Sequence, residues 1–476
     1  MTYDTLGAAT RTHGHARAFC QTLRGAPLRP RLIATPSRPR ASLAKPQRTL
    51  ENFAMPSTPV RPSGPRPISP SSSADSTRRH FIQGATSLLG ASFLTTTPLA
   101  LGAPAPSIQG FETAPASPDF SRGWQPFSER RLRVGIAGYG VCKFGSAFGF
   151  QDHPNVEVVA VTDLLPDRCA ALAEACRCLK TYPSLELMVK DPKIEAVFVA
   201  TDAPNHTRHC LEALAHGKHV AVAVPAVFGS LEEADLLWAA VKKSGLKYMM
   251  FETSAFHEDL HAMRTIYRAG GLGQLLYSEG EYYHYVATPI DSYRGWRIGL
   301  PPQWYPTHSN AYHICVTGGT FTSVSCLGMP SAITDFSASQ NTYKNPFATE
   351  IALFKTSEGG AARMAVSWDT PGASGEMGRI RGQSGSFYGK YQGLRKELPN
   401  LQRPPIPPTL KGAYSGHHGG SHAFLTDEFV RAILQNRTPL IHVAMALNLT
   451  VAGIVAHQSA MQGGASLKIP QYALPA

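Results

Sequence analysis

The sequence predicts an α/β protein in which a doubly wound parallel sheet is followed by an α+β domain with a largely antiparallel, open sheet. First, a short apolar strand, Leu132–Ala137, runs directly into closely spaced glycines. Second, continuous apolar strands then alternate with helical segments as far as residue 252, which is typical of a parallel sheet covered on both faces. Third, strands of period two with Gly-rich turns follow from Gly273 onward, and these indicate an antiparallel sheet.

The glycines after the first strand predict a nucleotide site. Gly138, Tyr139 and Gly140 would let the backbone turn tightly and approach a pyrophosphate at the start of the next helix. The third glycine of a complete G-x-G-x-x-G pattern would fall on Lys143, so the motif is incomplete and an ordinary strand-to-helix turn is the alternative. We therefore expect a Rossmann-type domain over residues 131–252.

An acid follows the second strand. Val156–Thr162 is rich in β-branched residues, and Asp163 comes directly after it, 25 residues beyond Gly138 (163 − 138). In dinucleotide-binding folds an acid about 20 residues after the glycines reaches the ribose hydroxyls. A carboxylate there repels a 2′-phosphate, so the sequence favours NAD as the cofactor and makes NADP less favoured.

The remaining elements of this domain have clear boundaries. Pro166 is placed to start a helix, and Ser230 with Glu233 forms a capping box that opens another. Further buried strands are expected at Ile194–Ala200, His219–Val224 and Lys247–Phe251.

The second domain is expected over residues 253–476. Its last two helices are predicted at Ser421–Asn436, which is amphipathic, and Val443–Ala460, which is apolar throughout. Its strands are predicted at Gln274–Tyr283, Thr349–Lys355, Ala361–Trp368, Gly378–Gly382 and Ser386–Tyr391.

The net charge of +12 is concentrated near the N-terminus. Residues 1–76 have a balance of +8, and Arg78 and Arg79 raise it to +10, so the rest of the chain is close to neutral. We therefore expect no nucleic acid partner. Residues 1–76 are rich in Pro, Ser and Arg and read as a disordered leader, which translation from Met55 instead of Met1 would shorten.

Residues 77–105 resemble a twin-arginine export signal. Thr77–Ile82 carries the two arginines, the moderately apolar stretch Gly84–Leu101 follows, and small residues stand at Ala103 and Ala105. A membrane anchor is the alternative, but interspersed Thr, Ser, Gly and Pro make the stretch weakly apolar. We expect export by the twin-arginine translocase to the periplasm, a Pro/Ser/Ala-rich linker over 106–130, and no integral membrane span after signal removal.

The sequence predicts neither a disulfide framework nor a metal site. Seven of the eight cysteines follow the export signal, and none form a Cys-x-x-Cys pair. His417, His418 and His422 lie in a Gly-rich loop where adjacent histidines diverge, and no carboxylate or Cys stands at a ligand spacing. That loop is interpreted as a helix entry near the substrate, with Ser421 as the cap.

Five segments of the chain form one pattern: Val134–Gly140, Val161–Asp163, Glu195–Thr201, Pro204–His206 and His216–Val220. Through these segments, residues 131–472 resemble the Gfo/Idh/MocA oxidoreductases. The resemblance implies that Gly138, Tyr139 and Gly140 face the pyrophosphate and Asp163 the adenosine ribose. It also implies that Thr201, Asn205 and His206 line the nicotinamide side, and that the exposed second sheet pairs in a homo-oligomer.

One motif of that family is altered. Its Glu-Lys-Pro is replaced by Ala223, Val224 and Pro225, so only the proline remains, beside the cofactor. In the family that lysine sits between nicotinamide and substrate and assists proton transfer. Its replacement by Val224 leaves simple alcohol oxidation without its usual lysine.

Three further segments resemble a branch that includes NAD-dependent α-N-acetylgalactosaminidases: Val224–Ala226, Met249–Glu252 and Tyr305–His308. Enzymes of that branch oxidise and re-reduce a sugar while eliminating its aglycone. This chain has Ala223 and Phe256 where the branch has Glu and Tyr, so two acid/base positions differ.

His308 is the predicted acid/base residue, because histidine has a pKa near working pH. Its segment, Trp304–His313, stands where the family supplies its active-site helix, and Tyr312 four residues on would share its helix face. His284 or Tyr283, at the end of a strand, would contact sugar hydroxyls, or else pack in the core.

These observations predict an NAD-dependent oxidoreductase acting on a sugar or polyol hydroxyl by hydride transfer. The alternatives are redox-neutral NAD-dependent glycoside cleavage through a keto-sugar intermediate, and a non-catalytic sugar-binding protein. In each case the partner is a small carbohydrate.

Overall fold

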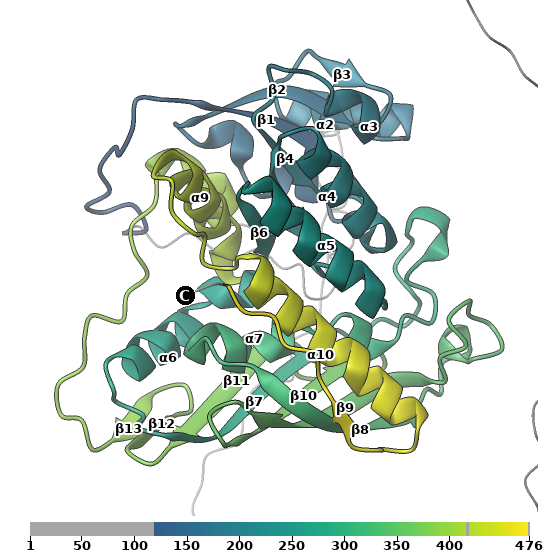
Figure 1. Ribbon diagram of the computed structural model, residues 1–476, viewed down its shortest axis with the longest axis vertical. Helices are drawn as coiled ribbons and strands as arrows, with labels where there is room; N and C mark the ends of the chain where they lie inside the picture. The colour runs from purple at the N-terminus through teal and green to yellow at the C-terminus, as the bar shows by residue number, and fades with distance from the viewer. Residues whose placement is uncertain (1–118, 416–417, 475–476) are drawn as a thin grey trace, which may run out of the picture. The chain divides into compact units, whose positions relative to one another are not determined.

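Two sheets follow one another along the part of the chain that the computed structural model describes, residues 119–415 and 418–474 (Figure 1). The predicted leader at 1–76, the predicted export signal at 77–105 and the first part of the linker lie outside these residues. Both sheets belong to the same compact unit of the chain.

Sheet A contains six parallel strands in the order β3-β2-β1-β4-β5-β6. The order reverses at β1, because β2 pairs with one edge of this strand and β4 with the other. In such sheets ligands bind at the carboxyl ends of the strands beside this reversal. The predicted doubly wound fold is thus confirmed, with strands β1 (Leu132–Ala137), β2 (Val156–Thr162), β3 (Thr181–Tyr182), β4 (Ala196–Val199), β5 (His219–Ala223) and β6 (Tyr248–Phe251).

The helices that connect these strands begin where the sequence predicts. Helix α2 starts at Pro166, and the hydroxyl of Ser230 accepts the N–H of Glu233 at 3.1 Å to cap α5. The helix after the glycines is a single turn. The helices are α1 (Phe144–Ala147), α2 (Pro166–Ala175), α3 (Leu185–Met188), α4 (His206–Ala215) and α5 (Leu231–Ser244).

Sheet B contains eight strands in the order β13-β12-β11-β7-β10-β9-β8-β14. Strands β7 and β10 are parallel and the other pairs are antiparallel, which confirms a largely antiparallel sheet. The strands are β7 (Leu275–Tyr283), β8 (Phe321–Pro330), β9 (Phe347–Thr356), β10 (Ala361–Ser367), β11 (Gly375–Gly382), β12 (Gly385–Phe387), β13 (Tyr391–Gly393) and β14 (Leu467–Lys468).

One strand prediction in this sheet is wrong, and one long strand was not predicted. The single strand expected at Ser386–Tyr391 is two strands, because Gly389 adopts a φ of +71° and turns the chain between β12 and β13. Strand β8 was not predicted, since its many Ser, Thr and Gly residues weaken the alternation of apolar and polar positions.

Helices cover one face of sheet B, and Figure 1 shows α6, α7 and α10 along it. Helix α7 lies close to the sheet because β7 has a glycine beneath it. A Cβ on Gly280 would lie 2.0 Å from the carbonyl oxygen of Ser309. These helices and their C-terminal neighbours are α6 (Glu258–Arg268), α7 (Thr307–Thr317), α8 (Lys411–Tyr414), α9 (Ser421–Leu434) and α10 (Val443–Met461).

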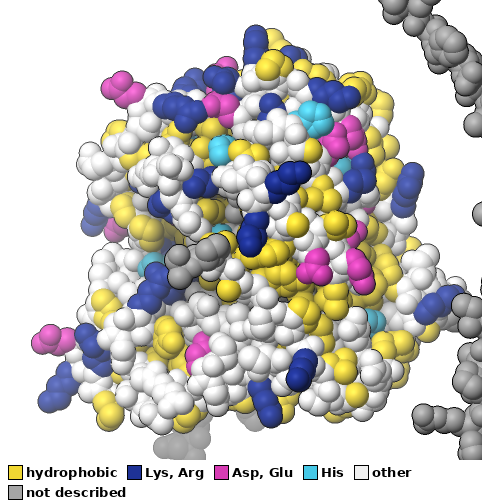
Figure 2. All heavy atoms as spheres, in the orientation of Figure 1, with side chains coloured by type: hydrophobic (Ala, Val, Ile, Leu, Met, Phe, Trp, Pro, Cys, Tyr) yellow, Lys and Arg dark blue, Asp and Glu magenta, His cyan; other side chains and the backbone are white. Residues whose placement is uncertain are grey.

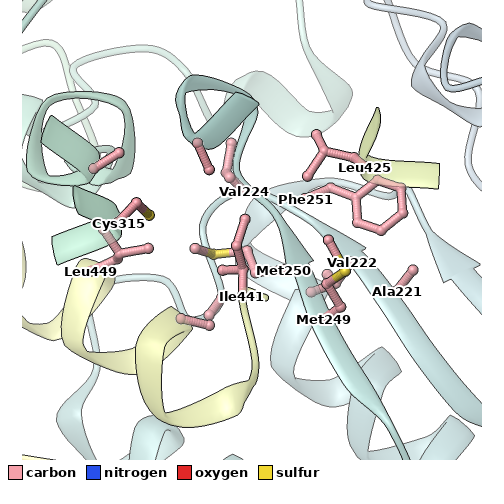
Figure 3. Close-up of a cluster of buried hydrophobic side chains, with 14 of the residues drawn as sticks. Ala221, Val222, Val224, Met249, Met250, Phe251, Cys315, Leu425, Ile441 and Leu449 are labelled. Atoms are coloured by element: carbon pink, nitrogen blue, oxygen red, sulfur yellow. The ribbon is translucent and has the colours of Figure 1, made fainter. Parts of the chain in front are cut away.

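The C-terminal segment belongs to the core of the nucleotide domain. In Figure 3 Met250 of β6 lies beside Ile441, while Leu449 of α10 lies beside Cys315 of α7. Helix α10 is long and apolar enough to cross a membrane, by length and composition only, yet 89% of its apolar window is buried. Because it packs against both sheets, α10 reads as a core helix.

Charges of both signs are mixed on the surface. On the face drawn in Figure 2, Lys and Arg side chains are interspersed with Asp and Glu and form no continuous band. The absence of a nucleic acid partner stays a prediction.

Candidate active site

A cleft opens at the carboxyl ends of the strands of sheet A, with an empty volume of about 1070 Å³. Among the residues predicted to bind the cofactor, six line this cleft: Gly138, Tyr139, Gly140, Asp163, Thr201 and His206. The structure therefore brings together the glycine turn, the ribose acid and the segment after β4.

The glycine turn fits a dinucleotide. Gly138 has a φ of +103°, and a Cβ there would lie 2.3 Å from the carbonyl oxygen of Ala200. Around Gly140 nothing lies within 4 Å of where a Cβ would be, so the backbone is open to a ligand. The carboxylate of Asp163 accepts the N–H of Tyr139 at 2.7 Å and that of Leu165 at 2.9 Å, which holds it beside the turn.

Two predicted cofactor residues lie behind the cleft wall. The amide of Asn205 donates to Asp202 at 2.6 Å, and neither Asn205 nor Pro225 lines the cleft. The carbonyl of Pro225 lies 2.8 Å from Nδ1 of His206. Asn205 and Pro225 therefore orient Asp202 and His206, and these two residues line the cleft.

A narrow inner cavity, with room for a group the size of a water molecule or a hydroxyl, continues the cleft toward sheet B. The cleft and the inner cavity share Phe144, Ala223, Val224, Arg297 and Tyr305. Thr253, His308 and His418 line its far side. A ligand in this cavity would contact the end of the cleft and His308 at once.

His308 lies in the first turn of α7, and it is 2% exposed. The helix is anchored by polar side chains within the core. The amide of Asn310 donates to the carbonyl of Leu449 at 2.8 Å, and the hydroxyl of Ser309 donates to that of Pro306 at 2.9 Å. Burying polar side chains is costly unless each of them is hydrogen-bonded, so the polar run of this buried helix points to a functional role.

Two carboxylates face the imidazole of His308. Its Nδ1 lies 2.9 Å from Oε1 of Glu252 and 3.6 Å from Oε1 of Glu376. Glu252 directly follows β6 and is fully buried, and Glu376 lies in β11 with a side chain that is 3% exposed. Three elements that are distant in the sequence thus meet at one point.

Two more histidines surround Glu376. Nε2 of His257 lies 3.1 Å from its Oε2, and Nδ1 of His418 makes a short contact with its Oε1. We call Glu252, His257, His308, Glu376 and His418 the Glu–His cluster.

The cluster sets the protonation of its members. Burial would lower the pKa of His308, but the two facing carboxylates outweigh burial and raise the pKa to about 9. Burial would raise the pKa of Glu376, yet the imidazoles of His308, His257 and His418 hold it well below its usual range. Burial lowers the pKa of His257 despite Glu376. With these groups alone, His308 is a proton donor near neutral pH, whereas the sequence predicted a residue with a pKa near working pH.

The other predicted catalytic residues differ in position. Tyr312 donates its hydroxyl hydrogen to the carbonyl of Glu376 at 2.8 Å, so it borders the cluster. His284 is buried and its ring stacks on that of Tyr282 at 5.6 Å. Tyr282 lies 4.5 Å from the ring of His308.

Tyr283 is not brought to the site. Alternation along β7 puts its side chain on the opposite face of the sheet from Tyr282, which is the tyrosine beside His308. The structure therefore does not bring Tyr283 to the inner cavity, which Tyr282 lines instead, and a contact between the substrate and His284 or Tyr283 stays a prediction.

An outer cavity reaches the cluster from the opposite side. It is lined by His257, Glu376, Tyr312, Arg403 and Tyr388, and its empty volume, open solvent included, is about 1830 Å³. The cluster therefore separates a solvent-open hollow from the inner cavity.

The fold and the cleft define the class of this protein: a nucleotide-binding α/β domain joined to an open-sheet domain, as in dinucleotide-dependent oxidoreductases. The family described as "Oxidoreductase family, NAD-binding Rossmann fold" (Gfo/Idh/MocA) matches residues 132–252. The match is confined to that domain, which is an NAD-binding Rossmann domain of the kind that the family's description names.

Curated relatives resemble part of the chain. "Glycosyl hydrolase family 109 protein 1" of Bacteroides fragilis (strain YCH46) is 30% identical over 167 residues, which are 32% of this chain and 35% of the relative. A glycosyl hydrolase family 109 protein of Saccharopolyspora erythraea is 24% identical over 289 residues, or 54% of this chain and 62% of the relative. The chain spans about a third of the length of the first of these relatives.

Solved structures share the fold at greater length. Levoglucosan dehydrogenase in complex with NADH and levoglucosan has a TM-score of 0.59 at 17% identity, covering 72% of this chain and all of that one (100%). Scyllo-inositol dehydrogenase from Lactobacillus casei, with bound NAD(H) and scyllo-inositol, has a TM-score of 0.56 at 16% identity, covering 71% and 99%.

The sequence alone missed most of the Glu–His cluster. Glu376 and His257 carried no signal, because their role depends on which strand and turn lie beside α7. Glu252 lies in a segment that carries the resemblance to the glycosidase branch. Two features of the sequence pointed to the region: the polar run of α7 and the loop of His418 and His422. Arg297 lies in the loop 294–297, for which the sequence leaves open either contact with an acidic or hydroxylated substrate or a solvated position, and it lines both the cleft and the inner cavity.

Proposed function

We propose that this protein is an NAD-dependent oxidoreductase that acts on a sugar or polyol hydroxyl by hydride transfer. One observation carries the proposal: the inner cavity has His308 at one end and shares Val224, Arg297 and Tyr305 with the nucleotide cleft. A hydroxyl held in this cavity would lie between a proton-exchanging group and the nicotinamide end of the cleft.

Different residues of the chain would bind the cofactor, exchange the proton and exclude water. The turn at Gly138 to Gly140 and the carboxylate of Asp163 would hold the dinucleotide, which when bound accepts a hydride. His308 would exchange a proton with the substrate oxygen, and Glu252 fixes its ring through the 2.9 Å contact at Nδ1. Tyr282 and Tyr305 pack around His308 and would exclude water.

The second candidate is redox-neutral glycoside cleavage through a keto-sugar, favoured by the family 109 relatives. Against it stand Ala223 and Phe256 at the two altered acid/base positions. Phe256 is buried and its ring stacks on Phe424 at 5.8 Å, so it contributes packing only. For that reason we place this reaction second.

The experiment incubates the full chain with NAD⁺ and a panel of free sugars, polyols and aryl glycosides, and follows NADH and aglycone together. NADH accumulation with a free sugar or polyol supports the main proposal. Aglycone release without net NADH supports the second candidate. Tight NAD binding with no turnover on any substrate would contradict both and leave a sugar-binding protein.

The variant His308→Gln should lower the rate by about 10²- to 10⁴-fold with unchanged NAD affinity, because the proton-exchanging group is lost. His313→Gln, on the same helix but directed at Glu358, is the matched control and should keep its rate. Equal rates for the two variants would argue against a catalytic His308.

We also propose twin-arginine export to the periplasm and a homo-oligomer. The oligomer is supported by exposed apolar side chains on sheet B, with Leu327 62% and Leu353 55% exposed. Sedimentation of the purified chain tests the oligomer, and fractionation of cells in which both arginines of the signal are changed to Lys tests export.

A further inference from the structure

We propose that the Glu–His cluster binds one divalent cation, zinc or manganese, through Glu252, His308 and Glu376. The ligand atoms of these three residues all lie within 4.8 Å of one another. An imidazole nitrogen and carboxylate oxygens are the donors that both cations accept. The sequence predicted no metal site here, because Glu252, His308 and Glu376 are distant from one another along the chain and form no local ligand motif.

The spacing suits a single ion. Ligands about 2.0 to 2.2 Å from a tetrahedral zinc lie roughly 3.3 to 3.6 Å apart. The two contacts of Nδ1 of His308, 2.9 Å to Glu252 and 3.6 Å to Glu376, fall around that value. A cation would take the position of the proton on Nδ1 and pull the three groups to similar distances.

An unsatisfied carboxylate oxygen supplies a second, independent observation. The side chain of Glu252 is fully buried, and its Oε2 has no hydrogen-bond partner among the described residues. Leaving a buried charged acceptor unpaired is costly, whereas a metal ion would satisfy it. The other oxygen, Oε1, already accepts the N–H of Ser254 at 2.9 Å, so the carboxylate is oriented before an ion binds.

Outer contacts complete the site. His257 and His418 both touch the carboxylate of Glu376, and the hydroxyl of Ser254 donates to it as well. Groups of this kind orient ligands in known metal centres. The outer cavity, which reaches Glu376 and His257, gives an ion a route from solvent.

The position of the site suggests its use, and this step rests on the proposed function. Val224 stands where the family has a lysine, so the inner cavity has no ammonium group at that point. His308 lines the inner cavity, so a divalent cation at its Nδ1 would place positive charge beside a hydroxyl or carbonyl oxygen held there and polarise it. The cation would thus supply the positive charge that Val224 cannot.

The test measures metal directly and needs no turnover. The full chain is stripped with chelator and then titrated with Zn²⁺ and with Mn²⁺, with and without NAD⁺. We expect one equivalent per chain, and affinity at least about 100-fold weaker in Glu252→Gln and Glu376→Gln, because each removes a charged ligand. Glu358→Gln, which removes a carboxylate from a His–Glu pair elsewhere, is the matched control and should bind as the unaltered chain does.

Binding of neither cation, or equal binding by the cluster variants and the control, would overturn the proposal. If a cluster variant does not fold, pulsed EPR of Mn²⁺ on the unaltered chain decides: an imidazole nitrogen coupling supports the site and its absence contradicts it. Metal binding without NAD binding would refute the proposed function while leaving the metal site intact. NAD turnover in a metal-free protein would refute the role proposed for the cation and leave the proposed function intact.

Discussion

At the scale of single residues, His308 depends on partners from two other parts of the chain. Glu252 ends a strand of sheet A and Glu376 lies in a strand of sheet B, so the cluster joins the nucleotide domain to the substrate domain. Neither carboxylate occupies the position of the family's lysine, which is held by Val224. Both instead concentrate negative charge around one imidazole, and that charge is what a proton or a cation at Nδ1 would balance.

Glu358 offers a test of how such pairs affect stability outside the site. Its carboxylate lies 3.2 Å from Nε2 of His313. Burial would raise the pKa of Glu358, but the hydrogen bond and charge of His313 outweigh burial and lower the pKa to about 2, from the 4.5 that is usual for a glutamate. A lowered carboxyl pKa in the folded state stabilises the protein above the pKa of the unfolded state and loses this effect as pH falls toward the folded pKa.

We therefore predict that Glu358→Gln lowers the free energy of unfolding at pH 7 by about 1–2 kcal/mol, a figure reduced to allow for solvent screening. The deficit should shrink as the pH falls from about 4.5 toward about 2. Thermal midpoints of the two proteins, measured across this range, check it. A deficit that is the same at pH 7 and near pH 2.5 would contradict the ion-pair explanation.

At the scale of elements, the position of α7 decides the site. The helix carries His308 and Tyr312, and two glycines in the sheet beneath it allow the close approach. A Cβ on Gly280 would lie 2.0 Å from Ser309, and one on Gly378 would lie 2.1 Å from the ring of Tyr312. Because neither position has room for a side chain, the distance between α7 and sheet B is fixed by the sequence of the sheet.

Gly280→Ala should therefore destabilise the protein by about 1–3 kcal/mol, the usual cost of overpacking a core, and displace His308 from its partners. Turnover should fall while NAD affinity stays unchanged, since the glycine turn and Asp163 lie in the other domain. Gly412→Ala is the control, because nothing lies within 4 Å of a Cβ in that position of α8. Equal stability of the two variants would show that α7 can shift without cost.

At the scale of the whole molecule, the sequence predicted the local features well and their meeting points poorly. The glycine turn, the acid after β2, the cap at Ser230 and the start of α2 all follow from neighbouring residues, so a local pattern suffices for each. The Glu–His cluster requires Glu252, His308 and Glu376 to meet, and no local pattern contains that information. The alternation along β7 was visible in the sequence, and it puts Tyr283 on the opposite face of the strand from Tyr282 and His284. Which of the two faces meets α7 was not visible there.

The strand pairing of sheet B was equally beyond local patterns. That β7 and β10 run parallel depends on the long connection between them, which the helix α7 and strands β8 and β9 occupy. The same connection places His308 over β7. The strand order and the composition of the site both depend on the path of this connection, which local sequence patterns do not predict.

The central claim is that the cleft of sheet A holds NAD, with Asp163 selecting it. The direct measurement is a calorimetric titration of the full chain with NAD⁺ and with NADP⁺. We predict one NAD⁺ per chain, with NADP⁺ at least about tenfold weaker, because Asp163 would repel a 2′-phosphate. Failure to bind either nucleotide, or tighter binding of NADP⁺, would contradict the claim.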